Sequence, residues 1–242
     1  MADRFIVANS GAFHEGSRID WEFGPLVAHA VELAGVSGRA PKVGYLPTAH
    51  GDQQSRIAQR LFAANQRGWQ LNPLVTFLMP NVADPREYLL DQDVIWVDGG
   101  SVANLLAIWR VHGLDAIMRE AWEQGIVLAG TSAGSICWHL GGSTDSFGPE
   151  LRPITNGLGF LPYGNGVHYN ATPLRRAVTQ AMVARADVPE AYSTDNGVGL
   201  VYNGTELVDV VADRRDAYGW HTYMSGDGVA EDRITPRLLP EL

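Results

Sequence analysis

Ser132 is the side chain in this sequence whose neighbours best suit covalent chemistry. It stands in the run Gly130-Thr131-Ser132-Ala133-Gly134, between the apolar residues 126–129 and a predicted helix over 135–140. Glycines on both sides of a serine allow a sharp strand-to-helix turn that exposes the hydroxyl, and the start of the helix adds N–H groups and a positive dipole end. A glycine-rich turn with an incidental serine gives the same pattern. A nucleophile therefore needs support from a base, an orienting acid and a second oxyanion donor.

A histidine is the usual base for such a serine, because a hydroxyl is a poor nucleophile until its proton is removed. The chain has seven histidines. Six of them fall in helical patterns or polar loops, where a structural role is favoured: His14, His29, His50, His112, His139 and His221. His168 differs, because it ends the next short strand predicted after the Gly-x-Ser-x-Gly run and so comes to the same edge of the sheet. The sequence favours His168 as the base.

The orienting acid must accept a hydrogen bond from the second imidazole nitrogen. Asp145 is the best placed, because it lies in the stretch between the candidate nucleophile and the candidate base. Its setting also suits an Asx turn that only holds a loop. Glu150 and Asp195 are the alternatives.

A second glycine turn supplies the oxyanion donor. Gly99 and Gly100 follow a predicted strand over 93–98, and with the N–H of Ala133 they predict a hole with two donors. A tight strand-to-helix turn is the alternative explanation. Cys137 lies on the helix after Ser132, and we expect it in the core.

Composition limits the class of protein. The chain has 242 residues, is 45% hydrophobic and carries a formal net charge of −9, which predicts one sizeable core and disfavours nucleic acid or an anionic membrane as a partner. A lone cysteine excludes an intrachain disulfide and favours a reducing compartment. With no signal-peptide pattern and no apolar run of about 18 residues, we expect a cytoplasmic protein.

Predicted strands alternate with predicted helices over the first half of the chain. The strands are expected at 4–10, 42–46, 74–78, 93–98 and 125–131, and the helices at 23–33, 52–66, 85–90, 101–109 and 113–125. This alternation predicts an α/β fold, a doubly wound, mostly parallel sheet with helices on both faces. Sites in such sheets lie beyond the carboxyl ends of the strands, where both glycine turns are expected.

The second half of the chain changes in character. Residues 141–162 are rich in turn formers and are predicted to be a long loop of functional importance, followed by a short strand over 166–169 and a helix over 172–186. Strands are predicted at 198–202 and 206–211 across Asn203-Gly204, and another pair flanks 225–228. We expect these as antiparallel edge strands of a single domain spanning residues 1–242.

Several motifs in order resemble the dipeptidase E (aspartyl dipeptidase) family of serine peptidases, which is related to cyanophycinase and similar in fold to class I glutamine amidotransferases. The residues that carry the resemblance are Gly130–Gly134, Val97–Ser101 with Asn104–Leu106, Gly113–Asp115, Thr144–Ser146, and Leu158–Pro162 leading to His168-Tyr169. The similarity extends over most of the chain and is closest between about 94 and 170.

The resemblance implies a catalytic triad of Ser132, His168 and Asp145, with the oxyanion held by the N–H groups of Gly100 and Ala133. It also implies hydrolysis of small peptides, dipeptides with an N-terminal aspartate above all. No metal and no cofactor are implied, and the expected partner is the peptide substrate, with the chain as a monomer or a homodimer.

Two departures from the family pattern affect the expected substrate. The family's Gly-Gly-Gly-Asn run stands here as Asp98–Ser101, and the segment after the histidine is shortened to residues 169–173. Arg175 or Arg176 then becomes the candidate for binding a substrate carboxylate, because a guanidinium suits that group. A β-aspartyl or isopeptide substrate, as in cyanophycinase, and a non-catalytic small-ligand-binding protein on the same fold are the alternatives.

Overall fold

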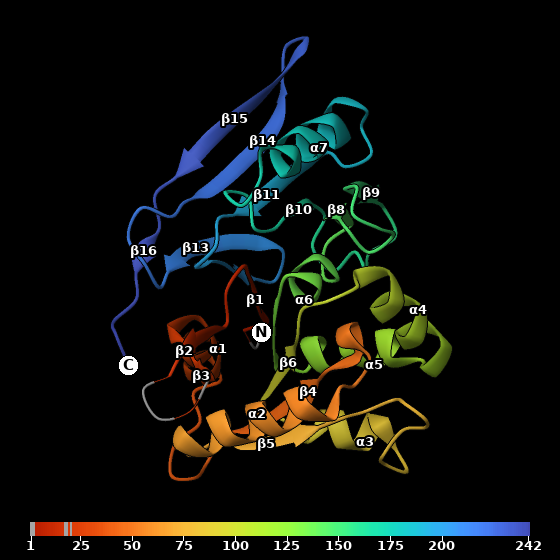
Figure 1. Ribbon diagram of the computed structural model, residues 1–242, viewed down its shortest axis with the longest axis vertical. Helices are drawn as coiled ribbons and strands as arrows, with labels where there is room; N and C mark the ends of the chain where they lie inside the picture. The colour runs from red at the N-terminus through yellow and green to blue at the C-terminus, as the bar shows by residue number, and fades with distance from the viewer. Residues whose placement is uncertain (1–2, 17–18, 20) are drawn as a thin grey trace.

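Eight strands form the main sheet of the protein (Figure 1), whose computed structural model describes residues 3–16, 19 and 21–242. Their order is β16-β13-β12-β1-β7-β6-β4-β5. The strands are β1 (Phe5–Asn9), β4 (Lys42–Leu46), β5 (Gln70–Pro73), β6 (Val94–Val97), β7 (Val127–Thr131), β12 (Val198–Asn203), β13 (Glu206–Ala212) and β16 (Arg237–Leu238). Neighbours from β1 to β5 are parallel, whereas β12 is antiparallel to β1 and to β13. The predicted parallel sheet with antiparallel strands along one side is confirmed.

Helices cover both faces of the main sheet, because its central strands are apolar on both sides. In β6, Val94 and Trp96 pack into one core cluster, and Ile95 and Val97 pack into the other, as the alternation of side chains along a strand requires. The first face is covered by α1 (Pro25–Leu33) and α2 (Gln54–Gln66), and the second by α4 (Val102–His112), α5 (Leu114–Glu123) and α6 (Ala133–Ile136). A short helix α3 (Pro85–Leu90) contacts α5, and a 3-10 turn η1 (Thr48–His50) follows β4. The predicted doubly wound fold is confirmed.

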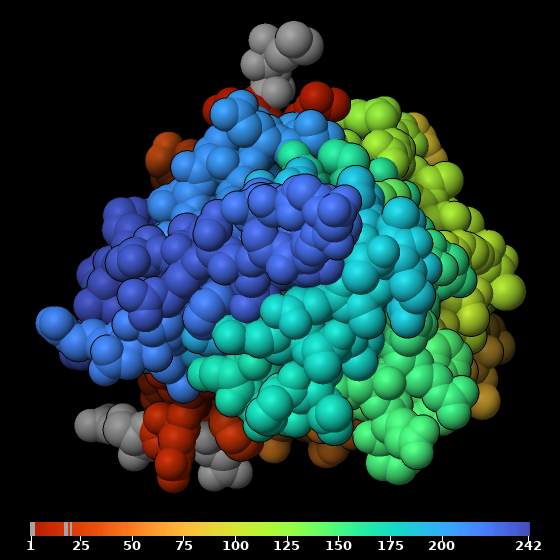
Figure 2. Space-filling view, turned by 90° about the horizontal axis from the view of Figure 1, so that it is seen from above, coloured from red at the N-terminus to blue at the C-terminus, as the bar shows by residue number. Residues whose placement is uncertain are grey.

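A second sheet of six strands lies beside the main one, in the order β15-β14-β11-β10-β8-β9. Its strands are β8 (Gly141–Thr144), β9 (Arg152–Ile154), β10 (Gly164–Gly166), β11 (Glu190–Thr194), β14 (Gly219–Ser225) and β15 (Gly228–Ile234). Helix α7 (Pro173–Ala184) packs against this sheet, and Figure 2 shows the β14–β15 hairpin lying across the same face of the molecule beside α7. The strand pair flanking residues 225–228 was expected at an edge of one sheet, and it belongs to this second sheet instead.

The prediction of a loop over residues 141–162 is wrong in part, because β8 and β9 lie within it. A Cβ atom on Gly141 would overlap the carbonyl oxygen of Ile154, and one on Gly142 would overlap the carbonyl oxygen of Asn165. These glycines therefore permit neighbouring strands to approach closely. Glycine content, which predicts a loop in most sequences, here reflects strand packing.

The strand predicted over residues 74–78 is also wrong. The pairing with β4 ends at Tyr45 and Pro73. Beyond that point the N–H groups of Thr76 and Phe77 donate to the carboxylate of Asp52, which holds the segment away from the sheet. Leu78 is fully exposed, so this apolar run forms a surface loop.

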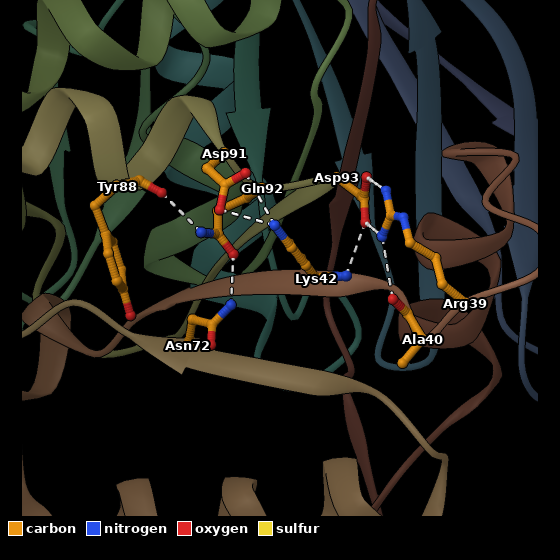
Figure 3. A network of polar contacts seen from close by, with 8 residues as sticks. All are labelled: Arg39, Ala40, Lys42, Asn72, Tyr88, Asp91, Gln92 and Asp93. Carbon is orange, nitrogen blue, oxygen red and sulfur yellow. Dashed lines mark hydrogen bonds and ion pairs between the residues drawn. The ribbon is translucent and has the colours of Figure 1, made fainter.

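Polar side chains hold the amino ends of β4 and β6 and tie β5 to the residues before β6 (Figure 3). Arg39 donates two hydrogen bonds to Asp93, at 2.6 and 2.7 Å, and the backbone N–H of Lys42 donates to the same carboxylate at 2.8 Å. Asn72 donates to Gln92 at 2.8 Å. This network fixes the end of the sheet that lies opposite the carboxyl ends of the strands.

Two smaller features complete the fold. A two-stranded hairpin of β2 (Phe13–Glu15) and β3 (Trp21–Phe23) follows β1 and packs on α2. Within the described ranges, none of the helices has the length and apolar character that crossing a membrane requires.

Candidate active site

Ser132 stands at the sharp turn between β7 and α6. Its backbone has φ 55° and ψ −111°, a conformation that residues other than glycine adopt at a cost. Its N–H donates to the carbonyl oxygen of Asn9 at 3.0 Å. A Cβ atom on Gly130 would overlap the carbonyl oxygen of Gly134, and a Cβ atom on Gly134 would overlap that of Val97. Both glycines of the Gly-x-Ser-x-Gly run are therefore needed to close the turn.

The glycine turn after β6 lies directly against this serine. A Cβ atom on Gly99 would come within 3.2 Å of the Ser132 Cβ, and Gly100 has a φ of 141° that favours glycine. The N–H of Ser101 donates to the carbonyl oxygen of Ala49 at 2.7 Å, which holds the turn in place. In the described part of the chain, the N–H groups of Gly100 and Ala133 have no hydrogen-bond partner. Both N–H groups are thus available to an oxyanion beside Ser132.

His168 reaches the same edge of the main sheet from the second sheet. It lies two residues beyond β10, and its N–H donates to Ser10 Oγ at 2.9 Å. Ser10 follows Asn9, the residue that accepts the N–H of Ser132. The last residue of β1 and the residue that follows it therefore hold the candidate nucleophile and the candidate base. Across the described residues, no hydrogen bond joins the Ser132 hydroxyl to His168, a contact that often forms only when substrate is bound.

The imidazole of His168 is held by an amide. Its Nδ1 lies 2.5 Å from Asn196 Oδ1. Burial is the largest influence on this ring and lowers the pKa of His168 below 6.5, and the charge of Arg175 lowers it further, while the Asn196 hydrogen bond and the charge of Asp145 oppose the shift. The ring is therefore neutral at pH 7 and can accept a proton.

Comparison with known proteins identifies the family. The sequence profile of Peptidase family S51 matches residues 25–210. The uncharacterized peptidase YgaJ of Bacillus subtilis (strain 168) is 36% identical over 199 residues, which cover 82% of this chain and 85% of that protein. The chain belongs to peptidase family S51. The predicted membership of the dipeptidase E family is confirmed, and with it the prediction that this protein is a hydrolase of the peptidase class.

Solved structures support the fold of this S51 peptidase. A peptidase from an acI-B1 actinobacterium superposes with a TM-score of 0.66 at 19% identity, covering 100% of this chain and 97% of that one. A Listeria monocytogenes EGD-e protein, whose crystal structure is named for peptidase E, gives a TM-score of 0.61 at 18% identity, covering 97% of this chain and 100% of that one. At these identities the likeness concerns the fold.

None of the three carboxylates predicted as the orienting acid accepts a hydrogen bond from His168 in the described part of this S51 peptidase. Asp145 is largely exposed and accepts from Arg175 Nη2 at 3.4 Å. Asp195 accepts from the Trp220 indole N–H and from a backbone N–H, each at 3.0 Å. Glu150 is exposed. The Nδ1 partner of His168 is thus the amide of Asn196 and none of these carboxylates, and a role for Asp145 stays a prediction.

Asn196 was missed from the sequence because β11 was not predicted. β10 and β11 are parallel neighbours, and His168 and Asn196 each stand two residues beyond the end of their strand. Parallel strands bring such residues to one edge. The stretch Asp195-Asn196-Gly197 has only the pattern of a turn, so the signal appears once the strand is known.

The two arginines predicted to bind substrate differ in their surroundings. The side chain of Arg175 is 11% exposed, and its buried Nε has no hydrogen-bond partner among the described residues. Burial lowers the pKa of Arg175, against the opposing charge of Asp145. Arg176 instead pairs with Glu231 at 3.1 Å and lies over the ring of Trp220 at 4.1 Å. Arg175 therefore has a donor that no described residue accepts, whereas Arg176 is already paired with Glu231 and stacked on Trp220.

Metal-binding side chains do not converge in the parts of the chain that the structure describes. No group of three histidine, cysteine or carboxylate side chains there has the arrangement to hold a metal ion. His139, one of the histidines assigned a structural role, is fully buried and contacts the Ser135 carbonyl at 2.9 Å.

Proposed function

We propose that this S51 peptidase is a serine hydrolase that cleaves small peptides, with Ser132 as the nucleophile and His168 as the general base. The observation that carries the proposal is the strained turn at Ser132, where a half-buried serine is followed by an unpartnered N–H on Ala133 and packs against the glycine turn that carries the unpartnered N–H of Gly100. Backbone strain of this kind is retained where function requires it. His168 lies at the same edge of the sheet and is neutral at pH 7.

The reaction follows from this arrangement. His168 Nε2 takes the hydroxyl proton as Ser132 Oγ bonds to the peptide carbonyl carbon, and the negative charge moves to the carbonyl oxygen, which accepts from the N–H groups of Gly100 and Ala133. Collapse of the tetrahedral intermediate breaks the C–N bond, and His168 returns the proton to the leaving amine. Water then attacks the carbonyl carbon of the acyl-enzyme while His168 takes its proton. The bond between that carbon and Ser132 Oγ breaks, His168 returns the proton to Oγ, and the carboxylic acid product leaves.

In the proposed mechanism, Asn196 contacts His168 Nδ1, the atom that the acid of a catalytic triad would contact. The amide oxygen can only accept a hydrogen bond, so its contact with Nδ1 requires the proton on Nδ1 and leaves Nε2 free to accept the serine proton. Cys-His-Asn sites show that an amide can serve this purpose. Asp145, the acid predicted for the triad, contributes its negative charge nearby and favours the imidazolium that forms.

Dipeptides with an N-terminal aspartate are the first candidate substrates, and β-aspartyl or isopeptide bonds are the second. Arg175 supports an acidic substrate, because its buried Nε lacks an acceptor and its neighbour Asp145 is close to His168. A guanidinium suits a carboxylate at such a position.

Labelling with a fluorophosphonate tests the proposal. We expect one adduct per chain, mapped by mass spectrometry to Ser132, and parallel loss of hydrolysis in a panel of α- and β-linked aspartyl dipeptides with their asparaginyl and alanyl counterparts. Labelling at another residue contradicts the assignment of Ser132. So does the absence of labelling in a preparation that hydrolyses the panel.

Asn196→Asp is expected to move the acid limb of the pH dependence of kcat/KM upward by about one pH unit. A carboxylate next to Nδ1 stabilises the imidazolium and raises the pKa of His168, which burial now holds below 6.5. As the pH is lowered, His168 is therefore protonated at a higher pH than in the unmodified protein. Activity at pH 6 falls relative to activity at pH 8. The pH profile of kcat/KM measures this shift.

Asn156→Asp is the matched control, because Asn156 is exposed and the same charge is added away from His168. Its acid limb should coincide with that of the unmodified protein. An unchanged limb in Asn196→Asp, or an equal shift in the control, contradicts the role given to Asn196.

A further inference from the structure

A cleft of about 470 Å³ lies between the β2–β3 hairpin and the first half of α2. Phe13 and Trp21 supply aromatic walls from the hairpin, and Arg56, Gln59 and Arg60 line it from the helix. None of the described lining residues is acidic, although the chain as a whole has a formal net charge of −9. We call this feature the α2 cleft. Its volume is in the range of ligand-binding pockets.

Arg60 is the buried cation of the α2 cleft. Its side chain is 7% exposed, and its guanidinium carbon lies 3.4 Å from the centroid of the Phe13 ring. Its Nε donates to Asp98 at 3.4 Å. Its Nη1 is buried without a hydrogen-bond partner among the described residues. A buried donor of this kind is stabilised by any ligand that supplies an acceptor.

Two further sources of positive potential meet in the same place. The N-cap residue of α2, Gln53, makes no side-chain capping bond, and the first turn of the helix contains no acidic residue. The helix therefore presents free N–H groups and the positive end of its dipole. Arg56, in that first turn, is exposed and forms no ion pair within the described ranges. These groups together suit a carboxylate.

The α2 cleft is close to the candidate nucleophile. Phe13 stands four residues after Asn9, whose carbonyl accepts the N–H of Ser132, so the connecting chain spans at most about 14 Å. On the other side, Arg60 contacts Asp98, and the next residue, Gly99, lies against Ser132. An extended peptide covers about 3.3–3.6 Å per residue. A group in the cleft is therefore a few residues of extended peptide from a bond at Ser132.

We infer that the α2 cleft is a substrate subsite for a carboxylate of an acidic peptide, a few residues from the bond attacked by Ser132. The inference rests on the proposed function, and it extends the substrates from dipeptides to acidic oligopeptides. Arg60 Nη1, Arg56 and the N–H groups of α2 bind the carboxylate, and the aromatic walls contact the stem of the acidic side chain.

Peptide binding to the catalytically inactivated chain tests the inference. Fluorescein-labelled tetraglutamate and tetraglutamine are titrated with the Ser132→Ala protein, and fluorescence anisotropy gives Kd. We expect tetraglutamate to bind at least about 10-fold more tightly, with an affinity that decreases with salt, because the contacts are between charges. Adding Arg56→Glu should weaken tetraglutamate about 10-fold or more and leave tetraglutamine unchanged. Arg56 is exposed, so this variant should fold.

Arg39→Glu is the matched control. It makes the same change of charge at an exposed arginine next to the amino ends of the strands, far from the α2 cleft along the sheet. Equal weakening by Arg39→Glu and Arg56→Glu overturns the inference, as does the absence of a preference for tetraglutamate. Fluorophosphonate labelling of the unmodified chain is scored separately, so a failure of Ser132 as the nucleophile is distinguishable from a failure of the cleft to bind.

Discussion

Replacing Ser132 with alanine is expected to lower kcat by about 10⁴-fold or more. The substitution removes the only atom that the proposed mechanism joins to the substrate and leaves the glycine turns and His168 in place. Residual hydrolysis then comes from the backbone N–H donors and from substrate binding alone. Steady-state kinetics on the best substrate of the aspartyl panel, with enzyme concentrations raised to detect slow turnover, measure the change. KM should change little.

Stability separates this effect from a loss of folding. In the described structure the Ser132 hydroxyl has no hydrogen-bond partner, so Ser132→Ala should change the free energy of unfolding by less than about 1 kcal/mol. Ser135→Ala is the matched control on the same turn. This substitution removes a buried hydroxyl that donates to Asn165 Oδ1 at 2.9 Å. We expect it to lower the free energy of unfolding by about 1 kcal/mol and to leave kcat unchanged. If Ser132→Ala retains kcat within about 10-fold, Ser132 is not the nucleophile.

The turn at Ser132 was predictable because its chemistry is local. Gly130 and Gly134 are needed where one carbonyl oxygen passes close to another backbone segment, and this need appears in the sequence as a short motif. The same holds for the hairpin at Asn203-Gly204, where Gly204 has a φ of 60°. Apolar runs likewise predicted β1, β4, β6, β7, β12 and β13 of the main sheet, whose faces are both covered, whereas β5 lies before the predicted residues 74–78 and β16 was not predicted.

Part of the second sheet was not predictable in the same way, because β8, β9 and β10 are short and β8 and β10 are rich in glycine. β10 consists of Gly164, Asn165 and Gly166, and both glycines lie where a Cβ would come closer than about 3 Å to a neighbouring side chain. Composition of this kind indicates a loop unless the pairing is known. Asn196 became visible only through that pairing, since its position beside His168 depends on β10 and β11 being parallel neighbours.

Asp98 is one of the two residues, with Ser101, at which this chain departs from the family's Gly-Gly-Gly-Asn run, and it lies at the centre of a buried network. Its carboxylate accepts from the Gly99 N–H at 2.9 Å and from the Tyr45 hydroxyl at 2.8 Å, and it contacts Arg60 Nε at 3.4 Å and His50 Nε2 at 3.3 Å. Through Gly99 the carboxylate holds the turn that carries the Gly100 N–H. Neither Tyr45 nor Arg60 stands near Asp98 in the sequence, so only the fold assembles this network.

Asp98→Asn is expected to reduce the free energy of unfolding by about 3 kcal/mol at pH 7, because it leaves the buried Arg60 without its counter-charge. It should also lower kcat by a factor on the order of 10², since the amide NH₂ opposes the surrounding donors and displaces the Gly99–Gly100 turn. Urea denaturation and steady-state kinetics measure the two effects. Full activity in a destabilised variant would show that the network stabilises the fold without positioning the turn.

The contribution of Asp98 to the free energy of unfolding decreases as the pH is lowered. Burial alone would raise the pKa of Asp98, but the His50 hydrogen bond, the charge of Arg60 and the Tyr45 hydroxyl lower it from 3.8 to about 2. Ionised Asp98 therefore stabilises the fold fully above about pH 4, by about 2 kcal/mol at ~1.4 kcal/mol per pKa unit, and this contribution is lost as the pH falls towards 2. The difference in the free energy of unfolding between the unmodified protein and Asp98→Asn should become smaller below pH 4.

Asp93→Asn provides the matched control at the other end of β6. Asp93 also pairs with an arginine, but the side chain of Arg39 is 51% exposed and can regain water when its partner is neutral. We expect Asp93→Asn to cost about 1 kcal/mol or less and to leave kcat unchanged, because its network (Figure 3) lies before β6, whereas the Gly99–Gly100 turn follows β6. Equal losses of the free energy of unfolding in the two variants would mean that burying Arg60 does not make its ion pair with Asp98 more stabilising than the exposed pair. A larger loss in Asp98→Asn, accompanied by the fall in kcat, ties the buried charge to the position of the oxyanion donor.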